Sequence, residues 1–265
     1  MHSNTNKLFD LGGRVAIVTG GAGWLGSALS EGLAQSGAKV CVVDFNQDYL
    51  DQMRSRFENN GVKAEFINAD TMQESGLKRC LDAVASGFGR LDILVNCAYT
   101  GPSPEIDEAT FEDFDKGLHN GVSAYGIAAQ TAVKHMRKIG GGSIINIGSM
   151  YGMVTGYPEV YAGVTKPTSI VYQAGKAAVI QMTKYMAVYW AKDHIRVNCI
   201  SPGPFLQRDI PVKLPLFAAR ISQKVPMGRF GQPHEIKGAA VFLASDASSF
   251  ITGQNIVIDG GWTSW

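Results

Sequence analysis

The sequence has almost no net charge, since 24 Lys and Arg residues face 23 Asp and Glu residues in a chain of 265. A nucleic-acid-binding or membrane-surface protein would carry a basic excess, so the composition argues against both partners. Charged residues make up only 18% of the chain and hydrophobic residues 45%. That balance excludes an intrinsically disordered chain and leaves enough apolar surface for a large core.

Cysteine is scarce and scattered, at positions 41, 80, 97 and 199, with no CxxC pair and no Cys/His cluster. The five histidines show no metal-ligand spacing, so we expect no disulfide framework and no metal site. No apolar run approaches the roughly 18 residues of a membrane-spanning helix. The opening segment MHSNTNKLFDLGGR lacks the apolar stretch of a signal peptide. We therefore expect a cytoplasmic protein.

Glycine, in contrast, is abundant, with 31 residues that lie mainly in loops between apolar runs. Short runs rich in Val and Ile alternate with segments of helical periodicity, and such uninterrupted runs are typical of strands covered on both faces. The alternation predicts one α/β domain with a doubly wound parallel sheet of about seven strands. The expected strands are 15–18, 40–43, 64–68, 91–95, 143–147, 196–200 and 256–258, and the expected helices are 25–36, 48–59, 75–87, 110–137, 175–192 and 233–244.

A glycine-rich loop follows the first expected strand and precedes a helix, in the segment TGGAGWLG from Thr19 to Gly26. Glycines let backbone amides approach a pyrophosphate, and a helix N-terminus adds unpaired N–H groups and positive dipole. An acid about 20 residues further on strengthens the pattern, and Asp44 stands there. The sequence therefore predicts a dinucleotide site at Gly20, Gly23 and Gly26, against the alternative of a glycine-rich turn that binds nothing.

Asp44 also indicates which dinucleotide binds. A carboxylate at this place can accept hydrogen bonds from both adenosine ribose hydroxyls, whereas a 2′-phosphate would meet it as a like charge. At ~4 Å and an effective dielectric of ~20 that repulsion is about 4 kcal/mol. No Lys or Arg lies in the glycine loop or directly after Asp44 to offset it. The sequence therefore predicts NAD rather than NADP.

Several motifs together resemble the short-chain dehydrogenase/reductase family over nearly the whole chain. Each motif is weak by itself, but their order and spacing are specific. They are the loop TGGAGWLG, Asp70, Asn96-Cys97-Ala98, Ser149, Tyr172 with Lys176, Ser201-Pro202-Gly203, and Asp259-Gly260-Gly261-Trp262. Within the family, the pattern is most similar to gluconate 5-dehydrogenase-like and other sugar or polyol dehydrogenases. The resemblance implies a single Rossmann-type domain over residues 1–265.

The residue types at the candidate active site suggest proton transfer. Tyr172 and Lys176 stand at i and i+4, so on a helix they share a face. An ammonium ~5 Å from a phenol is worth about 3 kcal/mol at a dielectric of ~20, which would lower the tyrosine pKa toward neutrality. Alone, such a pair is more often an ordinary surface pair. The resemblance implies that Lys176 also holds the nicotinamide ribose and that Ser149 hydrogen bonds to the substrate oxygen.

Three features depart from the family pattern. Trp24 stands in the glycine loop where the family usually has glycine. Ser149 and Tyr172 are further apart than usual, and Tyr161 lies nearer the usual distance but has Thr165, not lysine, at i+4. We therefore choose Tyr172 and expect an insertion near 150–171. The catalytic asparagine of the family falls on Gly121. Its neighbour Asn120 could fill this fourth catalytic place through a helix irregularity, or could be a polar residue at a helix end.

The resemblance assigns further contacts residue by residue. The expected cofactor contacts are Gly20, Gly23, Trp24, Leu25, Gly26, Asp44, Asp70, Thr71, Asn96, Ala98, Tyr172, Lys176, Pro202, Gly203, Phe205 and Gln207. Asn96 could equally be a structural amide. A substrate lid is expected near 204–225, where Arg208 could meet a carboxylate. Tyr151 and Tyr161 are expected to contact the substrate, unless they merely pack the insertion.

These observations predict an NAD(H)-dependent oxidoreductase acting on a secondary alcohol or ketone of a sugar, sugar acid or polyol. A 3-oxoacyl-thioester reductase is one alternative, although such enzymes usually prefer NADP and need a basic patch for their acyl carrier. A non-catalytic dinucleotide-sensing regulator is another, and the intact Ser149, Tyr172 and Lys176 argue against it. A purely structural subunit is a further alternative, which failure to bind any nicotinamide nucleotide would favour. The resemblance implies a homotetramer, or a homodimer, formed through the helices near 112–137 and 175–190.

Overall fold

Seven parallel strands form one sheet in the computed structural model, which describes residues 4–265. Residues 1–3, and with them His2, lie outside that description. The strand order is β3-β2-β1-β4-β5-β6-β7. Each strand falls on a predicted apolar run: β1 (Val15–Thr19), β2 (Lys39–Asp44), β3 (Glu65–Asn68), β4 (Ile93–Asn96), β5 (Gly142–Ile147), β6 (Ile195–Pro202) and β7 (Asn255–Ile258). The predicted single domain with a doubly wound parallel sheet is confirmed.

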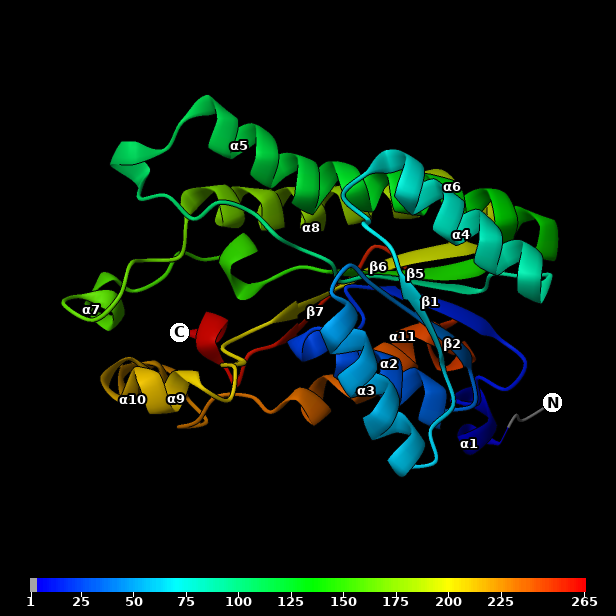
Figure 1. The fold of residues 1–265 in the computed structure, drawn as a ribbon, viewed down its shortest axis with the longest axis horizontal. Coiled ribbons are helices and arrows are strands. Elements are labelled where there is room, and N and C mark those ends of the chain that lie inside the picture. Colours follow the sequence, from blue (N-terminus) through cyan, green and yellow to red (C-terminus); the bar gives the residue numbers. More distant parts are fainter. Residues whose placement is uncertain (1–3) are drawn as a thin grey trace.

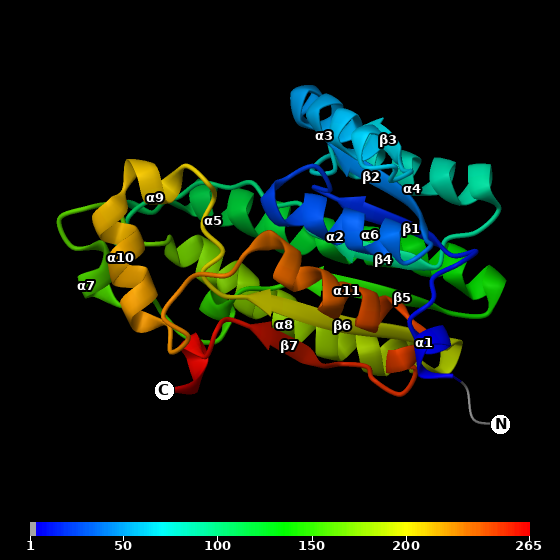
Figure 2. The same cartoon turned by 90° about the horizontal axis from the view of Figure 1, so that it is seen from below.

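Helices cover both faces of the sheet (Figure 1 and Figure 2). The layer of α4, α6 and α8 lies on one face, and α2, α3 and α11 lie on the other. The bounds are α1 (Thr5–Leu8), α2 (Trp24–Gln35), α3 (Gln47–Asn59), α4 (Glu74–Phe88), α5 (Phe111–Leu118), α6 (Ala124–Met136), α7 (Pro158–Tyr161), α8 (Ile170–Trp190), α9 (Ile210–Lys213), α10 (Pro215–Lys224) and α11 (Lys237–Ala244).

The two layers explain why strand β1 is apolar without alternation. Successive side chains of a strand point to opposite faces of the sheet. Val15 and Ile17 pack into the core under α4, α6 and α8, whereas Ala16 and Val18 pack into the core under α2, α3 and α11. All five residues of β1 are buried. Both faces therefore need hydrophobic residues, and the apolar run is continuous.

Two expected helices differ from their predictions. The segment 110–137 is not one helix, because a π-helical turn over His119–Ser123 separates α5 from α6. That turn is the irregularity considered for Gly121. Helix α8 begins before the predicted residue 175, because the Ser169 side chain caps it by accepting a hydrogen bond from the Val171 N–H at 3.1 Å. Tyr172 therefore lies in the first turn of α8.

The strand order places a crevice at the carboxyl ends of β1 and β4. The chain leaves β1 toward β2 and β3 on one side, then crosses to β4 on the other. Ligands of doubly wound folds bind outside the carboxyl ends of the strands at such a reversal. Among residues 4–265, no helix is both long and apolar enough to cross a membrane.

The segments 150–171 and 204–225 lie together at one end of the molecule, with α7, α9 and α10 (Figure 2). The guanidinium of Arg220 donates to the Ala162 carbonyl at 2.7 Å. Lys224 forms an ion pair with Glu159 at 2.7 Å. The expected insertion therefore packs directly against the expected lid.

Candidate active site

The glycine loop joins β1 to α2 with little space for side chains. A Cβ on Gly26 would lie 2.0 Å from the Gly20 carbonyl oxygen, and one on Gly20 would lie 2.7 Å from the Ala98 Cα. Gly20 also has a φ of 61°, in the left-handed region. Helix α2 begins at Trp24, with no side-chain cap and no acidic residue in its first turn. Its first N–H groups therefore remain available to an anion.

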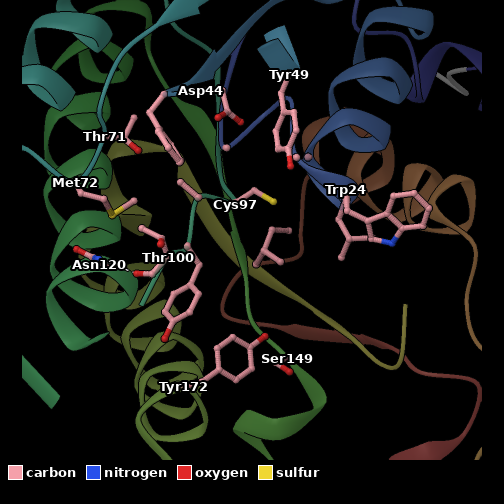
Figure 3. A pocket seen from close by; sticks show the side chains of 18 of the residues that line it. Trp24, Asp44, Tyr49, Thr71, Met72, Cys97, Thr100, Asn120, Ser149 and Tyr172 are labelled. Carbon is pink, nitrogen blue, oxygen red and sulfur yellow. Dashed lines mark hydrogen bonds between the residues drawn. The ribbon is translucent and has the colours of Figure 1, made fainter. Parts of the chain in front are cut away.

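A groove with a volume of about 1100 Å³ passes this loop along the carboxyl ends of the strands. Figure 3 shows Asp44 and Tyr49 toward one end and Ser149 and Tyr172 toward the other. The expected cofactor residues that line it are Gly20, Gly23, Trp24, Leu25, Gly26, Asp44, Asp70, Thr71, Ala98, Tyr172, Lys176, Pro202, Gly203, Phe205 and Gln207. The glycine cradle, which added Cβ atoms would fill, fits the pyrophosphate of a dinucleotide.

Asn96 is the exception, and its expected place in the groove is corrected. Its side chain is buried, and its Nδ2 donates to the Asn146 Oδ1 at 2.9 Å and to the Tyr125 carbonyl at 3.3 Å. Asn146 in turn donates to the Thr183 hydroxyl at 2.9 Å. Asn96 is absent from the groove lining, and its amide ties β4 to β5 and α6, which supports the alternative of a structural amide.

Asp44 ends strand β2 and is buried. Its Oδ2 accepts a hydrogen bond from the Ala22 N–H at 3.2 Å, and its Oδ1 accepts one from the Asn46 N–H at 3.1 Å. The carboxylate is thereby held beside the glycine loop. In the part of the chain that the structure describes, the groove lining contains no arginine; its lysines are Lys176 and Lys116, which is paired with Glu112 at 2.5 Å.

Ser149, Tyr172 and Lys176 come together where the groove ends. Ser149 follows β5 and caps a short 3-10 turn by accepting from the Tyr151 N–H at 3.1 Å. Its hydroxyl is near enough to lower the pKa of the Tyr172 phenol, and Figure 3 shows the two side chains next to each other. The buried Lys176 Nζ donates to the Ile147 carbonyl at 2.7 Å. Ser149 therefore lies beside Tyr172, the first residue of the predicted pair Tyr172 and Lys176.

The pKa of Tyr172 shifts in the opposite direction from the one expected. Burial raises the pKa of its phenol, and the hydrogen bond from Ser149 offsets only part of the rise. The Lys176 ammonium lies 5.6 Å from the centre of the Tyr172 ring and is turned toward the Ile147 carbonyl. Burial also lowers the pKa of Lys176, to about 8. Desolvation therefore outweighs the attraction that the i, i+4 spacing suggested.

We expect Lys176→Met to raise the stability of the protein at pH 7. A lysine whose pKa falls from 10.5 to about 8 on folding costs about 3 kcal/mol while it is charged. Below pH 8 that cost is fully present, and the wild-type protein recovers stability as pH rises from 8 to 10.5, because the unfolded chain then binds more protons. Loss of the bond to the Ile147 carbonyl offsets about 1 kcal/mol, so urea unfolding at pH 7 should show a net gain of about 2 kcal/mol.

The matched control is Lys184→Met, because Lys184 is exposed on the same helix. It should change stability by less than about 0.5 kcal/mol at either pH. The Lys176→Met gain should shrink by pH 10. A Lys176→Met protein less stable than wild type at pH 7, or a difference independent of pH, would contradict the assignment of a desolvated charge.

Asn120 lies in the π-helical turn and lines the groove. Its amide donates to the Thr100 carbonyl at 2.7 Å. A Cβ on the neighbouring Gly121 would lie 2.9 Å from Cε2 of Tyr99. The Tyr99 ring therefore occupies the space that a side chain at position 121 would need. π-Helical turns occur frequently at functional sites, and the role of Asn120 as a fourth catalytic residue stays a prediction.

A second cavity, of about 680 Å³, meets the groove at Ser149 and Tyr172. Its walls come from the segments 150–171 and 204–225, where an insertion and a lid were expected, and from the loop after β4. Tyr151 and Tyr161, the two tyrosines expected to contact the substrate, line it. Their hydroxyls bond to each other at 2.5 Å, and that of Tyr161 also bonds to Thr168 at 3.1 Å. Both tyrosines thus also pack the insertion, and they offer the cavity mainly ring surface.

Arg208 is not brought to either cavity. Its guanidinium lies 5.9 Å from the centre of the Trp24 ring, and it is absent from both linings. The indole Nε1 of Trp24 donates to the Phe205 carbonyl at 3.1 Å. Trp24, which stands where the family usually has glycine, therefore connects the glycine loop to the start of the segment 204–225. Within residues 4–265 no cluster of three His, Cys, Asp or Glu side chains could hold a metal ion.

Tyr99 is the main site residue that the sequence reasoning missed. It lines both cavities, and its ring packs edge-on against Tyr172 with the centroids 5.1 Å apart. Its position directly after Ala98, at the carboxyl end of a central strand, was the available signal. Tyr49 and Met72, from the segments after β2 and β3, also line the groove.

Comparisons with known proteins agree with this geometry. A family model described as Enoyl-(Acyl carrier protein) reductase matches residues 21–263. The chain is 33% identical to D-threitol dehydrogenase of Mycolicibacterium smegmatis over 96% of this chain and 95% of that protein. It is 34% identical to a 3-oxoacyl-(acyl-carrier-protein) reductase of Thermotoga maritima, with 95% and 98% covered. A gluconate 5-dehydrogenase from Burkholderia cenocepacia, solved with NADP and tartrate, matches with a TM-score of 0.87 and 32% identity, covering 99% of this chain and 100% of that one.

Proposed function

The chain belongs to the short-chain dehydrogenase/reductase family and is an enzyme that acts on CH–OH groups, and we propose that it is an NAD(H)-dependent oxidoreductase of a secondary alcohol or ketone on a sugar, sugar acid or polyol. The observation that carries the proposal is the meeting of two cavities at Ser149 and Tyr172. One has the glycine cradle of a dinucleotide, and the other is open to a small molecule.

The residues divide the proton chemistry between them. Ser149, which lies beside Tyr172 in the lining of both cavities, would hold the substrate oxygen. In the oxidation direction Tyr172 would accept the hydroxyl proton, and in reduction it would return it to the carbonyl oxygen. Lys176 uses one N–H on the Ile147 carbonyl, so two N–H groups remain for the nicotinamide ribose. A bound nicotinamide would accept or return the hydride.

NAD is proposed over NADP on the strength of Asp44. The buried carboxylate stands beside the glycine loop, and the groove lining in the described residues lacks an arginine that could pair with a 2′-phosphate. The Burkholderia cenocepacia enzyme was solved with NADP, so similarity alone does not select the cofactor. The local charge at Asp44 supports NAD.

The substrate class rests on the names of relatives and on polar groups around the second cavity. D-Threitol and gluconate are substrates named for two relatives. Ser103, Thr165, Lys166 and Thr168 supply polar groups around the cavity, and the tyrosine rings supply flat surface. Both features suit a polyhydroxylated ligand.

A screen of sugar acids, polyols and keto-sugars, followed through NADH absorbance, tests this proposal. We expect at least one member to turn over with a kcat/KM about tenfold or more above that of a 3-oxoacyl thioester. Each compound is measured with both cofactor types and with a protein-free control. If only 3-oxoacyl thioesters turn over, the proposed sugar, sugar acid or polyol class is wrong and the thioester class takes its place. If no compound turns over, the proposed enzymatic function is contradicted.

A 3-oxoacyl-thioester reductase is the second candidate. The lid contributes an apolar wall to the second cavity, formed by Leu206, Ile210, Leu214, Phe217 and Ile221. An acyl chain could pack against such a wall. The Thermotoga maritima relative carries that activity in its name. The carboxylate of Asp44 argues against the NADPH that such reductases usually prefer.

We also propose a homotetramer in the cytoplasm. Helix α8 exposes Tyr185, Val188 and Tyr189, and the two tyrosine rings stack with their centroids 5.9 Å apart. An exposed apolar row on a long helix is suited to helix packing between subunits. Light scattering that gives a monomer at micromolar concentration would contradict the tetramer. The cytoplasmic location stays a prediction.

A further inference from the structure

Three tyrosine rings surround the ammonium of Lys176. Its Nζ lies 5.4 Å from the ring centre of Tyr99, 5.4 Å from that of Tyr125 and 5.6 Å from that of Tyr172. These separations are within the range of cation–π attraction. The rings come from the loop after β4, from α6 and from α8. Of the three, the proposed proton transfer uses only Tyr172.

Tyr99 and Tyr125 contact their neighbours through their rings, and their hydroxyls make no hydrogen bond to the described part of the chain. Tyr125 is buried in the first turn of α6. The Tyr99 ring packs edge-on against Tyr172 and fits closely over Gly121. The contacts that fix the Tyr99 ring are therefore those with Tyr172, Gly121 and Lys176.

Among the residues that the structure describes, no carboxylate balances the charge of Lys176. The titratable groups that face it in the described residues are the Cys97 and Cys199 thiols and the three phenols. The one hydrogen bond of its Nζ to the chain goes to the Ile147 carbonyl. A desolvated cation without a counter-ion favours its neutral form. The two thiols and the Ile147 carbonyl favour the charged form in part, and the negative faces of the three aromatic rings can favour it further.

We propose that Tyr99 and Tyr125 are positioning residues for Lys176, and that their ring faces hold it as an ammonium where the two cavities meet. An ammonium beside Tyr172 favours the phenolate during proton transfer, whereas a neutral amine does not. This consequence for turnover rests on the proposed function. The attraction between the rings and Lys176 does not, and it can be measured without a substrate.

The direct test is a titration of Lys176 by NMR in protein carrying isotope-labelled lysine, with the signal assigned by its loss in Lys176→Met. Tyr99→Leu keeps an apolar side chain but removes the ring, so the Lys176 midpoint should fall by about one pH unit. Tyr99→Phe keeps the ring and is the matched control. Its midpoint should stay within about 0.3 of wild type. Tyr125→Leu and Tyr125→Phe should behave as a parallel pair.

If a leucine variant fails to fold, progressively fluorinated phenylalanines at position 99 replace it, because fluorine weakens the negative ring face with little change of shape. The midpoint should then fall stepwise with fluorination. Equal midpoints for the leucine and phenylalanine variants, a rise in Tyr99→Leu, or no trend with fluorination would overturn the inference.

The pH profile of turnover separates this inference from the proposed function. In Tyr99→Leu, the alkaline limb of the pH profile of turnover should move to lower pH by as many pH units as the Lys176 titration midpoint. In Tyr99→Phe, the alkaline limb should stay at the wild-type pH. A shifted titration in a protein without turnover would refute the proposed function and support the ring attraction. If the enzyme is active but the Lys176 midpoint and the pH profile of turnover are the same in Tyr99→Leu and Tyr99→Phe, the ring attraction is refuted and the proposed function is not.

Discussion

Tyr172→Phe should lower kcat at least a hundredfold while the affinity for NAD changes less than about threefold. The substitution removes only the hydroxyl that exchanges a proton with the substrate oxygen, and general acid–base groups contribute typically 10²–10⁴-fold. The ring remains to pack against Tyr99, so the site should keep its shape. Steady-state kinetics and calorimetric titration with NAD measure the two effects.

The control for this variant is Tyr161→Phe. Tyr161 is a buried tyrosine in the same cavity, but its hydroxyl is bonded to Tyr151 and Thr168. Its kcat should change less than about tenfold. If Tyr161→Phe lost turnover and Tyr172→Phe retained it, the choice between the two tyrosines would be wrong. A Tyr172→Phe protein that no longer binds NAD would leave a structural role as the explanation.

The second large effect concerns the cofactor. Wild-type protein should bind NAD at least about a hundredfold more tightly than NADP, because the 2′-phosphate would face the Asp44 carboxylate. Asp44→Asn keeps the side-chain size and an oxygen that can accept from the Ala22 N–H, which now reaches Asp44 at 3.2 Å. Its NADP affinity should rise about tenfold or more, with a smaller loss for NAD. Calorimetric titration with both cofactors checks the ratio.

Asp70→Asn is the matched control, because Asp70 is a second carboxylate lining the groove. It should leave the NAD to NADP ratio within about threefold of wild type, since its expected neighbour is the adenine. Tighter binding of NADP by the wild-type protein, or an unchanged ratio in Asp44→Asn, would show that another group sets the preference.

The strands and the catalytic pair were predictable because they depend on neighbours in the chain. The run from Val15 to Val18 must be apolar throughout, since helices cover both faces of β1. Tyr172 and Lys176 share a face of α8 by helical periodicity alone. The groove position of Asp44 and of the glycine loop follows from strand order, and parallel α/β chains allow few orders.

The errors concern contacts between segments far apart in the sequence. Asn96 was expected either in the groove or as a structural amide, and its amide reaches Asn146 across the sheet. Arg208 was expected at the substrate, but it lies against Trp24 of the glycine loop. The place of Tyr99 at a strand end was visible in the sequence, but its contacts with Gly121 and Lys176 were not. None of these pairings has a spacing that a sequence pattern could reveal.

The sequence by itself determined the sheet, the dinucleotide loop and the order of Ser149, Tyr172 and Lys176, since periodicity and strand ends are local properties. The tertiary structure alone decided the direction of the pKa shifts. Burial raises the pKa of Tyr172 and lowers that of Lys176, because desolvation depends on everything packed around a group and the attraction depends on where two side chains point. The cage of rings around Lys176 has the same origin, as three separate elements must meet before an ammonium can lie among them.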